Sequence, residues 1–267
     1  MKNKVTLRDI AREANVSVAT VSYVLNNRND QSISEATRKK ILQIVNLYNY
    51  KLNFSAKSIA SGKTNIIAMC LGKHDFALHK AEHMLAVERL SRYLFKRGYN
   101  LSIVYGEEVA HLDWCDAIIC CDTDSIFFAN LAEANYCPLL AFNTRSENQD
   151  LFYQINTDYE NVRRIADEIY KDKPYTVVSF PANSALLRDL LTATFPDVVF
   201  ADSYRSLDKL ANKNIVVLGE TLGEYCKRFA KDILVIDTCS KDKIGKLFEC
   251  FTFAVERKEG APHDIRI

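Results

Sequence analysis

Residues 6–26 read TLRDIAREANVSVATVSYVLN, and this stretch decides how the first part of the chain folds. Thr6 followed three residues later by Asp9 predicts a helix start, because the hydroxyl can accept a first-turn amide and the carboxylate faces the positive end of the helix. Apolar residues then recur at helical spacing until Asn15-Val16 breaks the pattern, and Ser17 restarts it as a second N-cap. Two short helices about three residues apart indicate a helix-turn-helix, although spacing alone leaves any small helical hairpin open.

In a helix-turn-helix, the second helix enters the DNA major groove by its N-terminal end. The side chains at that end and one turn further on are Ser17, Val18, Ala19, Thr20, Ser22 and Tyr23. Val18 and Ala19 are short and apolar, which favours contacts with thymine methyl groups over hydrogen bonds to base edges.

The segment VTLRDIAREANVSVATVSYVLN closely resembles the DNA-binding headpiece of the lactose-repressor (LacI/GalR) family of bacterial transcription regulators. The resemblance continues through SISEATRKKIL and on to NYKLNFSAKSIASGKTNIIAM; it is specific over residues 4–69 and much weaker afterwards. It implies further DNA contacts from Thr6, Leu7 and Asn26. The family usually has arginine at the position of Tyr23, so we expect a weaker guanine requirement at that step of the operator.

Ser34 caps a third predicted helix, which completes a DNA-binding headpiece of residues 1–49. Residues 50–63, YKLNFSAKSIASGK, have too little apolar surface to fold alone and indicate a linker. In the resembled family this segment is a hinge helix that orders on operator DNA. The resemblance therefore implies minor-groove contacts from Asn53, Ala56 and Ile59, with Ile59 as the wedge in the central base step. Leu52 stands where the family usually has proline, which weakens the helix start.

Residues 64–267 alternate strand-like and helix-like segments, which predicts parallel sheets flanked by helices. The predicted strands are 66–72, 100–106, 116–121, 137–142, 175–180, 197–202, 214–219, 233–237 and 263–267, and the predicted helices are 78–97, 124–135, 158–171, 184–194, 205–212, 221–232 and 241–260. The resemblance makes this body an effector-binding and dimerisation domain of two Rossmann-like lobes, of periplasmic-binding-protein type. The body is shorter than the family norm, mostly in the second lobe, so we expect that lobe to be reduced and one wall of the cleft to be low.

Charge is divided unevenly along the chain. Residues 1–63 hold 11 Lys/Arg and 4 Asp/Glu, a net of +7, and the remaining 24 Lys/Arg and 30 Asp/Glu give the body −6, which together make +1. A basic head on an acidic body indicates a protein that touches phosphates with one end. No apolar run approaches a membrane span, and the first residues lack a secretory signal. The eight cysteines form no CxxC pair, which favours reduced thiols in a cytoplasmic protein.

Ligands in open α/β sheets sit outside the carboxyl ends of the strands. The side chains selected by this rule are Lys73, His74, Asp75, Phe76, Asp122, Asp124, Glu220 and Asp237. The resemblance adds Arg188, at the place where the family carries an arginine that hydrogen-bonds sugar hydroxyls. The candidate effector site, for a sugar or a phosphorylated sugar, consists of Asp75, Phe76, Asp122, Arg188, Glu220 and Asp237. Each of them could instead be a solvated loop residue or a helix cap.

Residues 79–83, HKAEH, match the H-x-x-E-H pattern of some zinc proteases. The spacing places His79 and His83 on one helix face, as metal ligation requires. No later glutamate clearly supplies a third ligand, so we expect an exposed His/Glu face with no metal and no cofactor. Phosphate-binding glycine loops and a G-x-S-x-G elbow are absent from the sequence, so an enzyme, metal-dependent through His79, Glu82 and His83, is only an alternative.

The sequence therefore predicts a DNA-binding transcription regulator that is not an enzyme. By resemblance, a homodimer binds a near-palindromic operator, acts most often as a repressor, and responds to a small molecule. An alternative keeps the DNA binding but makes the body a dimerisation platform for a protein corepressor. A cleft with one low wall leads us to expect no tight binding of simple free hexoses or pentoses.

Overall fold

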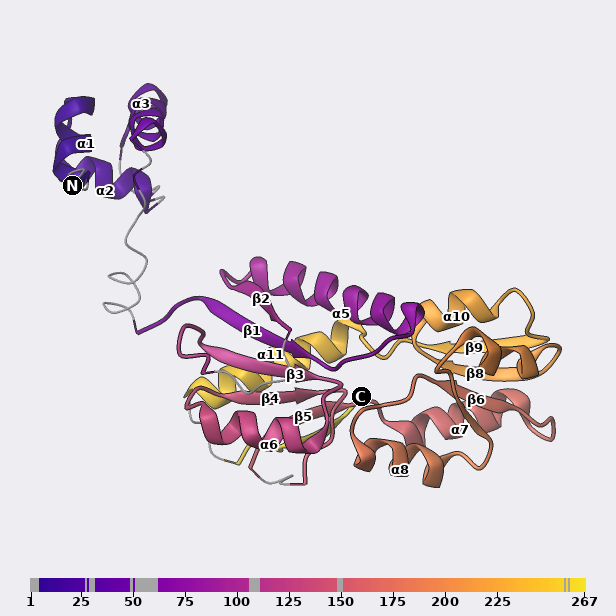
Figure 1. The fold of residues 1–267 in the computed structure, drawn as a ribbon. Coiled ribbons are helices and arrows are strands. Elements are labelled where there is room, and N and C mark those ends of the chain that lie inside the picture. The colour runs from indigo at the N-terminus through magenta and orange to yellow at the C-terminus, as the bar shows by residue number, and fades with distance from the viewer. Residues whose placement is uncertain are drawn as a thin grey trace. The chain divides into compact units, whose positions relative to one another are not determined.

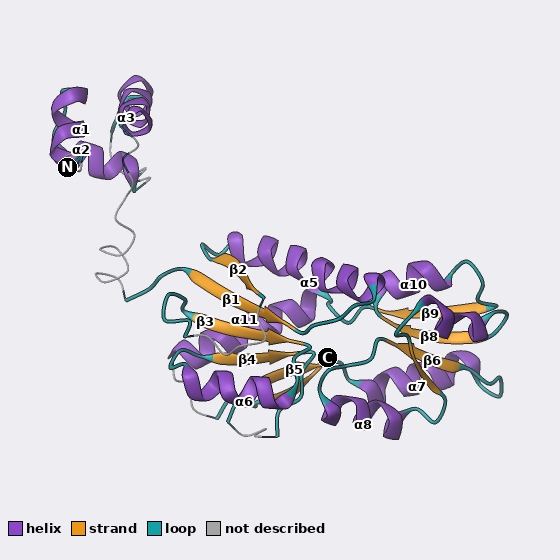
Figure 2. Cartoon of the chain, viewed as in Figure 1, coloured by secondary structure: helices purple, strands orange, loops and turns teal. Residues whose placement is uncertain are grey.

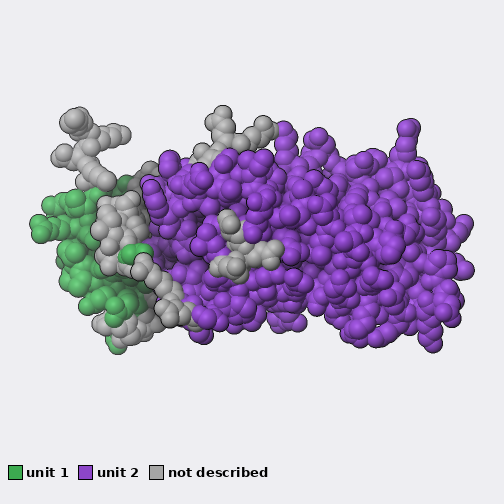
Figure 3. All heavy atoms as spheres, turned by 90° about the horizontal axis from the view of Figure 1, so that it is seen from below, with its two compact units in different colours: residues 1–62 green, residues 63–267 purple. Residues whose placement is uncertain are grey.

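The computed structural model describes residues 5–26, 28, 32–48, 50, 62–105, 111–147, 151–256, 258 and 260–267. The chain divides into two compact units, residues 1–62 and 63–267 (Figure 3). The first unit is helical and the second is an α/β body. The predicted hinge contacts Asn53, Ala56 and Ile59 lie outside the described residues.

The described residues of the first unit form three helices, α1 (Leu7–Ala14), α2 (Val18–Leu25) and α3 (Glu35–Leu47). Each begins where the sequence predicts, because a hydroxyl accepts a first-turn amide. The amide-to-hydroxyl distances are 3.4 Å from Asp9 to Thr6, 3.0 Å from Thr20 to Ser17 and 3.1 Å from Thr37 to Ser34. The side chains that form the shared core are Ile10, Ala11, Ala14, Val21, Val24, Ile41 and Ile44.

The first lobe of the body is built on a six-stranded parallel sheet in the order β10-β5-β4-β3-β1-β2. Its strands are β1 (Ile66–Leu71), β2 (Asn100–Val104), β3 (Ala117–Cys121), β4 (Leu139–Phe142), β5 (Tyr153–Asn156) and β10 (Asp264–Arg266). Helix α5 (Ala77–Phe95) and helix α11 (Lys241–Glu256) cover one face of this sheet, and α6 (Ser125–Ala134) covers the other (Figure 1).

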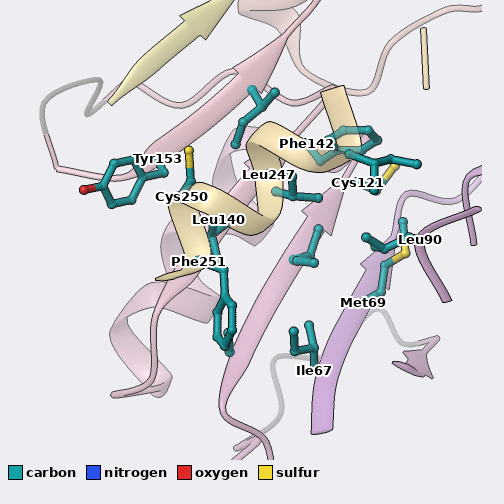
Figure 4. Packing of buried hydrophobic residues seen from close by; sticks show 14 of the residues in the cluster. Ile67, Met69, Leu90, Cys121, Leu140, Phe142, Tyr153, Leu247, Cys250 and Phe251 are labelled. Atoms are coloured by element: carbon teal, nitrogen blue, oxygen red, sulfur yellow. The ribbon is translucent and has the colours of Figure 1, made fainter. Parts of the chain in front are cut away.

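Alternation along β1 explains this layering. Ile67 and Met69 pack toward α5 and α11, whereas Ala68 and Cys70 pack toward α6. Successive strand residues point to opposite faces, so a strand covered on both sides must be apolar throughout. Figure 4 shows α11 bringing Leu247 and Phe251 into the first of these two cores.

The second lobe has a four-stranded parallel sheet in the order β7-β6-β8-β9 (Figure 2). Its strands are β6 (Thr176–Ser179), β7 (Val198–Phe200), β8 (Asn214–Leu218) and β9 (Asp232–Ile236). Its helices are α7 (Tyr159–Tyr170), α8 (Ala185–Thr194), the short α9 (Tyr204–Leu207) and α10 (Glu220–Cys226). Val177 packs with α7 and α8, and Val178 packs on the other face with α9 and α10.

The predicted fold class of a helical headpiece and a two-lobed parallel α/β body is confirmed. Two elements differ in kind from the sequence prediction, and the helix predicted at 221–232 ends earlier, at Cys226. Strand β5 was not predicted, because YQIN carries two polar residues that are buried here. The predicted helix 205–212 is one turn of α-helix followed by a 3₁₀ turn, Asp208–Leu210. Within the described residues, no helix has the length and apolarity that a membrane crossing requires.

Candidate functional site

The N-terminal end of α2 is the exposed part of the headpiece that the sequence selects for base contacts. Val21 and Val24 turn one side of α2 into the core, which leaves Ser17, Val18 and Ala19 exposed. Val18 keeps 41% of its surface in contact with solvent, although it is a large apolar residue on a small unit. An exposed apolar side chain here is the kind of group that meets a thymine methyl.

The polar side chains of the predicted set are engaged locally. The hydroxyls of Ser17 and Thr20 lie 2.8 Å apart at the helix start, and the Asn26 amide donates to the Ser22 carbonyl at 2.9 Å. The hydroxyl of Thr6 donates to Asp9 at 2.7 Å in a capping box, and Leu7 packs against the core. Tyr23 is half-buried, with the Arg28 guanidinium 5.9 Å from its ring centre.

A cavity of about 70 Å³ lies in the body, where the carboxyl ends of both parallel sheets meet. Its walls come from α5, the end of β3 and the loop after β4 in the first lobe, and from α7, α8 and the ends of β6, β8 and β9 in the second. The polar residues in these walls are His79, Glu82, His83, Asp122, Asn143, Tyr159, Ser179 and Thr238. The strand-end rule pointed to the edge of the sheets where this cavity lies, but only Asp122 of the six candidate effector residues lines it.

Four of the other five candidates are held elsewhere in the body. Arg89 of α5 binds Glu220 at 2.6 Å and Asp237 at 2.9 Å, and so ties the first lobe to the second. Arg188 donates to the carbonyls of Ala182 and Asn183 within the loop after β6. The ring of Phe76 packs edge-on against two aromatic rings of the second lobe, Phe180 and Tyr204.

Asp75, the last candidate, is exposed beside a separate open hollow of about 640 Å³ on the first lobe. The charged residues around that hollow include Lys73 and Lys80. The structure therefore does not bring the six candidates together at one place.

Glu82 lies in the inter-lobe contact and does not face solvent. Its carboxylate accepts the backbone amides of Glu220 at 3.0 Å and Thr221 at 2.8 Å, and the Thr221 hydroxyl at 2.6 Å. These are the first amides of α10, which no carbonyl within that helix can accept, so a carboxylate from α5 caps a helix of the other lobe. Our expectation of an exposed His/Glu face was wrong: His79, Glu82 and His83 are all buried, because α5 packs against the second lobe at this turn.

Three histidines surround the carboxylate of Asp122. Oδ2 of Asp122 lies 2.6 Å from Nε2 of His74, 3.1 Å from Nε2 of His79 and 3.4 Å from Nε2 of His83. The rings of His74 and His79 stack with their centres 3.4 Å apart, and His79 stacks on Phe180 at 4.3 Å. We refer to these four residues, His74, His79, His83 and Asp122, as the histidine cluster.

Burial and hydrogen bonding set the charges of this cluster. Burial acts to raise the pKa of Asp122, but the imidazoles of His74, His79 and His83 around the carboxylate outweigh burial and hold that pKa far below its ordinary value. Burial lowers the pKa of His79 to about 4, and the hydrogen bond to Asp122 only partly opposes this. At neutral pH, a carboxylate anion therefore faces a neutral His79.

The backbone around the cluster is tightly constrained. Asp122 has a φ of 50°, a left-handed conformation that is uncommon for residues other than glycine. A Cβ atom on Gly72 would lie 1.8 Å from the Asp122 carbonyl oxygen, so only glycine allows the loop after β1 to approach this closely. Asn183 of the second lobe reaches the same point, and its backbone N–H donates to Oδ1 of Asp122 at 2.9 Å.

Lys243 is the most deeply buried charged group near the cavity. Its ammonium donates to the Asn143 side chain and, at 2.9 Å, to the Thr157 hydroxyl. Burial lowers its pKa to about 7, while neighbouring Cys239, Cys121 and Asp237 act in the opposite direction. A buried amine that donates to two oxygens fixes α11 against the ends of β4 and β5.

The low pKa of Lys243 predicts a pH-dependent contribution to stability. Between pH 7 and 10.5 the unfolded chain binds the proton and the folded chain does not, so this residue's contribution rises with pH. Relative to Lys243→Met, the wild-type free energy of unfolding should rise by about 2–3 kcal/mol from pH 7 to pH 9. Urea unfolding at both pH values measures this. The partly exposed Lys246→Met on the same helix is the control, and the same pH dependence in all three proteins would contradict the prediction.

Sequence reasoning missed Arg89, Asn183 and Lys243. Arg89 stands seven residues after Glu82 and so shares its helix face, which was a usable signal. Nothing in the sequence marks Asn183 or Lys243, because their partners are distant in the chain.

Comparisons with known proteins agree with both units. The family model described as "Bacterial regulatory proteins, lacI family" matches residues 6–53. Catabolite control protein A of Streptococcus mutans is 40% identical over 67 residues, which cover 25% of this chain and 20% of that protein. The probable HTH-type transcriptional repressor ExuR of Bacillus subtilis is 30% identical over 166 residues, 58% of this chain and 48% of that protein. The chain thus spans half or less of the length of these two relatives.

Solved structures match over nearly the whole chain. The lac repressor dimer bound to operator and the anti-inducer ONPF aligns with a TM-score of 0.60 and 16% identity, over 99% of this chain and 96% of that one. At this identity the likeness establishes the fold of the body. The headpiece, residues 6–53, matches the LacI family of bacterial regulatory proteins, and the body shares the fold of a solved member of that group.

Proposed function

We propose that this protein is a sequence-specific DNA-binding transcription regulator that acts as a repressor. One of its relatives, ExuR, is named a probable transcriptional repressor. The observation that carries the proposal is the headpiece: three capped helices hold an exposed α2 end, and its sequence matches the family model. A net charge of +7 on residues 1–63 supplies attraction to phosphate. The reading residues are Ser17, Val18, Ala19, Thr20, Ser22 and Tyr23, with Thr6, Leu7 and Asn26 beside them and Asn53, Ala56 and Ile59 in the hinge.

The body acts as a dimerisation and signal-sensing domain in this proposal. The solved lac repressor whose fold it shares is a dimer on operator DNA, which supports a homodimer on a near-palindromic site. All eight cysteines are free thiols, in agreement with a reducing, cytoplasmic location. The domain limits that we propose are 1–49 for the headpiece, 50–63 for the hinge and 64–267 for the body.

Selection of operators from random duplexes tests the proposal. Wild-type protein should enrich a near-palindromic sequence, and Tyr23→Arg should shift one step of each half-site toward guanine. Arginine can take guanine bidentately, a pairing worth roughly 1–3 kcal/mol, whereas tyrosine offers one hydroxyl and a ring.

Tyr48→Arg is the matched control, because it adds the same charge at the exposed end of α3 and not on α2. It should leave the selected sequence unchanged. Failure to enrich any sequence would contradict the proposed function, and an unchanged preference in Tyr23→Arg would contradict base contact by Tyr23.

The inter-lobe cavity bears on the choice of effector. Pockets for small organic ligands are usually about 300–1,000 Å³, so a cavity of about 70 Å³ has room for waters or an ion and not for a hexose. The convergence of polar side chains there argues against a body that serves only as a corepressor platform. A sugar or phosphorylated sugar would require the lobes to part.

We expect calorimetry with neutral hexoses and pentoses to detect no micromolar binding, since the present cavity cannot enclose their hydroxyls. Micromolar binding of any one of them, abolished by Arg188→Ala, would contradict this and restore a sugar-sensing site.

A further inference from the structure

Three ring nitrogens of the histidine cluster approach the same carboxylate oxygen, Oδ2 of Asp122, and this oxygen cannot accept a hydrogen bond from all three. A carboxylate oxygen has two lone pairs, whereas Nε2 atoms of three imidazoles point at the same Oδ2 of Asp122. Nε2 of His83 consequently has no hydrogen-bond partner although it is buried. Leaving such an atom unpaired costs roughly 1–3 kcal/mol in a protein interior.

The contacts of His74 are also inconsistent with a cluster that is held by hydrogen bonds alone. Its Nε2 lies 2.6 Å from the Asp122 carboxylate, which can only accept, and 3.0 Å from the Asn183 amide nitrogen, which can only donate. One ring nitrogen cannot donate to the first and accept from the second. A cation at this point removes both conflicts, because each Nε2 atom then gives its lone pair to the metal, and the Asn183 side-chain amide still donates to the Asp122 carbonyl at 2.8 Å.

We propose that His74, His79, His83 and Asp122 form a binding site for a divalent transition-metal ion of the zinc type. Three imidazoles and one carboxylate are a ligand set that suits Zn²⁺ and excludes the oxygen-preferring Mg²⁺ and Ca²⁺. The four ligand atoms all lie within 4.8 Å of one another.

The spacing and charge of the cluster agree with this metal. Ligands about 2.0–2.1 Å from zinc in a tetrahedron lie roughly 3.3 Å apart, close to the 3.1 and 3.4 Å from Asp122 to His79 and His83, whereas the 2.6 Å from Asp122 to His74 is shorter. Asp122 adds one carboxylate to the three imidazoles, and carboxylate oxygen is a common zinc ligand beside histidine nitrogen.

The surrounding chain holds the ligands in place before any metal arrives. His79 and His83 are one turn apart on α5, Gly72 allows the loop that carries His74 to close over Asp122, and Phe180 of the second lobe packs on His79. Asn183 joins Asp122 to the second lobe, so the metal would sit where the lobes meet. Glu82, the acidic residue of the H-x-x-E-H pattern, caps α10 and is not a ligand.

The test is titration of the full chain with Zn²⁺ in competition with a chromophoric chelator. We expect one ion per chain, and a rise of about 5 °C or more in the unfolding midpoint at saturating Zn²⁺. His83→Gln and His74→Gln should each weaken binding by about 100-fold or more, since changes even to residues behind the ligands cost 10–100-fold. His111→Gln changes an exposed histidine outside the cluster and should bind as the wild type does.

Co²⁺ in place of Zn²⁺ separates this site from adventitious binding by cysteine. We expect visible bands of a tetrahedral nitrogen and oxygen site, without the near-ultraviolet thiolate band. Circular dichroism of His83→Gln establishes that the variant is folded. Because Nε2 of His83 has no hydrogen-bond partner in the structure, its removal leaves no partner of that atom unpaired. Equal affinity in His83→Gln and wild type, a thiolate band, or no stoichiometric binding would each overturn the proposal. The assay contains no DNA, so its failure leaves the proposed function unaffected.

Discussion

Raising the salt concentration from 50 to 200 mM is expected to weaken binding of the full chain to its selected operator by about 250-fold or more. Each phosphate neutralised contributes roughly 0.9 to the slope of log K against log salt. The surplus of seven positive charges on residues 1–63 leads us to expect a slope of about −4 or steeper for a dimer. Fluorescence anisotropy with a labelled duplex measures it.

The control for the salt titration is a charge change in the acidic body. Lys246 is partly exposed on α11 and pairs with Glu249 in the next turn, far from the headpiece in the sequence, so Lys246→Gln should leave the slope unchanged. A slope near zero in the wild-type protein would contradict phosphate contact by the headpiece, and with it the proposed DNA binding.

Glu82→Ala should be the most destabilising single change in the body among those considered. The substitution removes a buried carboxylate that accepts two backbone amides and one hydroxyl of the other lobe. A hydrogen bond to a charged group contributes about 1.5–3 kcal/mol at most. In the variant, the two amides and the hydroxyl would lose the carboxylate that accepts them. We expect the free energy of unfolding to fall by about 2–4 kcal/mol, with the unfolding midpoint roughly 5–15 °C lower.

Glu88→Ala is the matched control for this loss. Glu88 lies on the same helix and pairs with Arg92 one turn on, but both side chains are more than half exposed. Such surface pairs contribute about 0.3–0.5 kcal/mol, so the unfolding curve should hardly move. Equal unfolding curves for Glu82→Ala and wild type would mean that the carboxylate does not join the lobes.

Signals confined to a few neighbouring residues were sufficient to predict the headpiece. Thr6, Ser17 and Ser34 begin the three helices because each hydroxyl reaches an amide three residues away. The alternation of apolar runs and amphipathic helices likewise predicts parallel sheets, since a strand covered on both faces has to be apolar. Strand β5 was not predicted, because its Gln154 and Asn156 are polar. Both are buried and hydrogen-bonded to residues that the local sequence does not identify.

The sequence by itself indicated the resemblance of the headpiece to the LacI family, the helix end that faces outward and the edge of the sheets at which the body's cavity lies. The tertiary structure alone decided which side chains meet there. His74 and Asp122 are 48 residues apart, Asn183 and Asp122 are 61 apart, and Glu82 and Thr221 are 139 apart. Local spacing showed two histidines on one face of α5 and suggested that they faced solvent. The packing of the second lobe onto that face buries them, excludes water from Asp122, and turns a surface pattern into the histidine cluster.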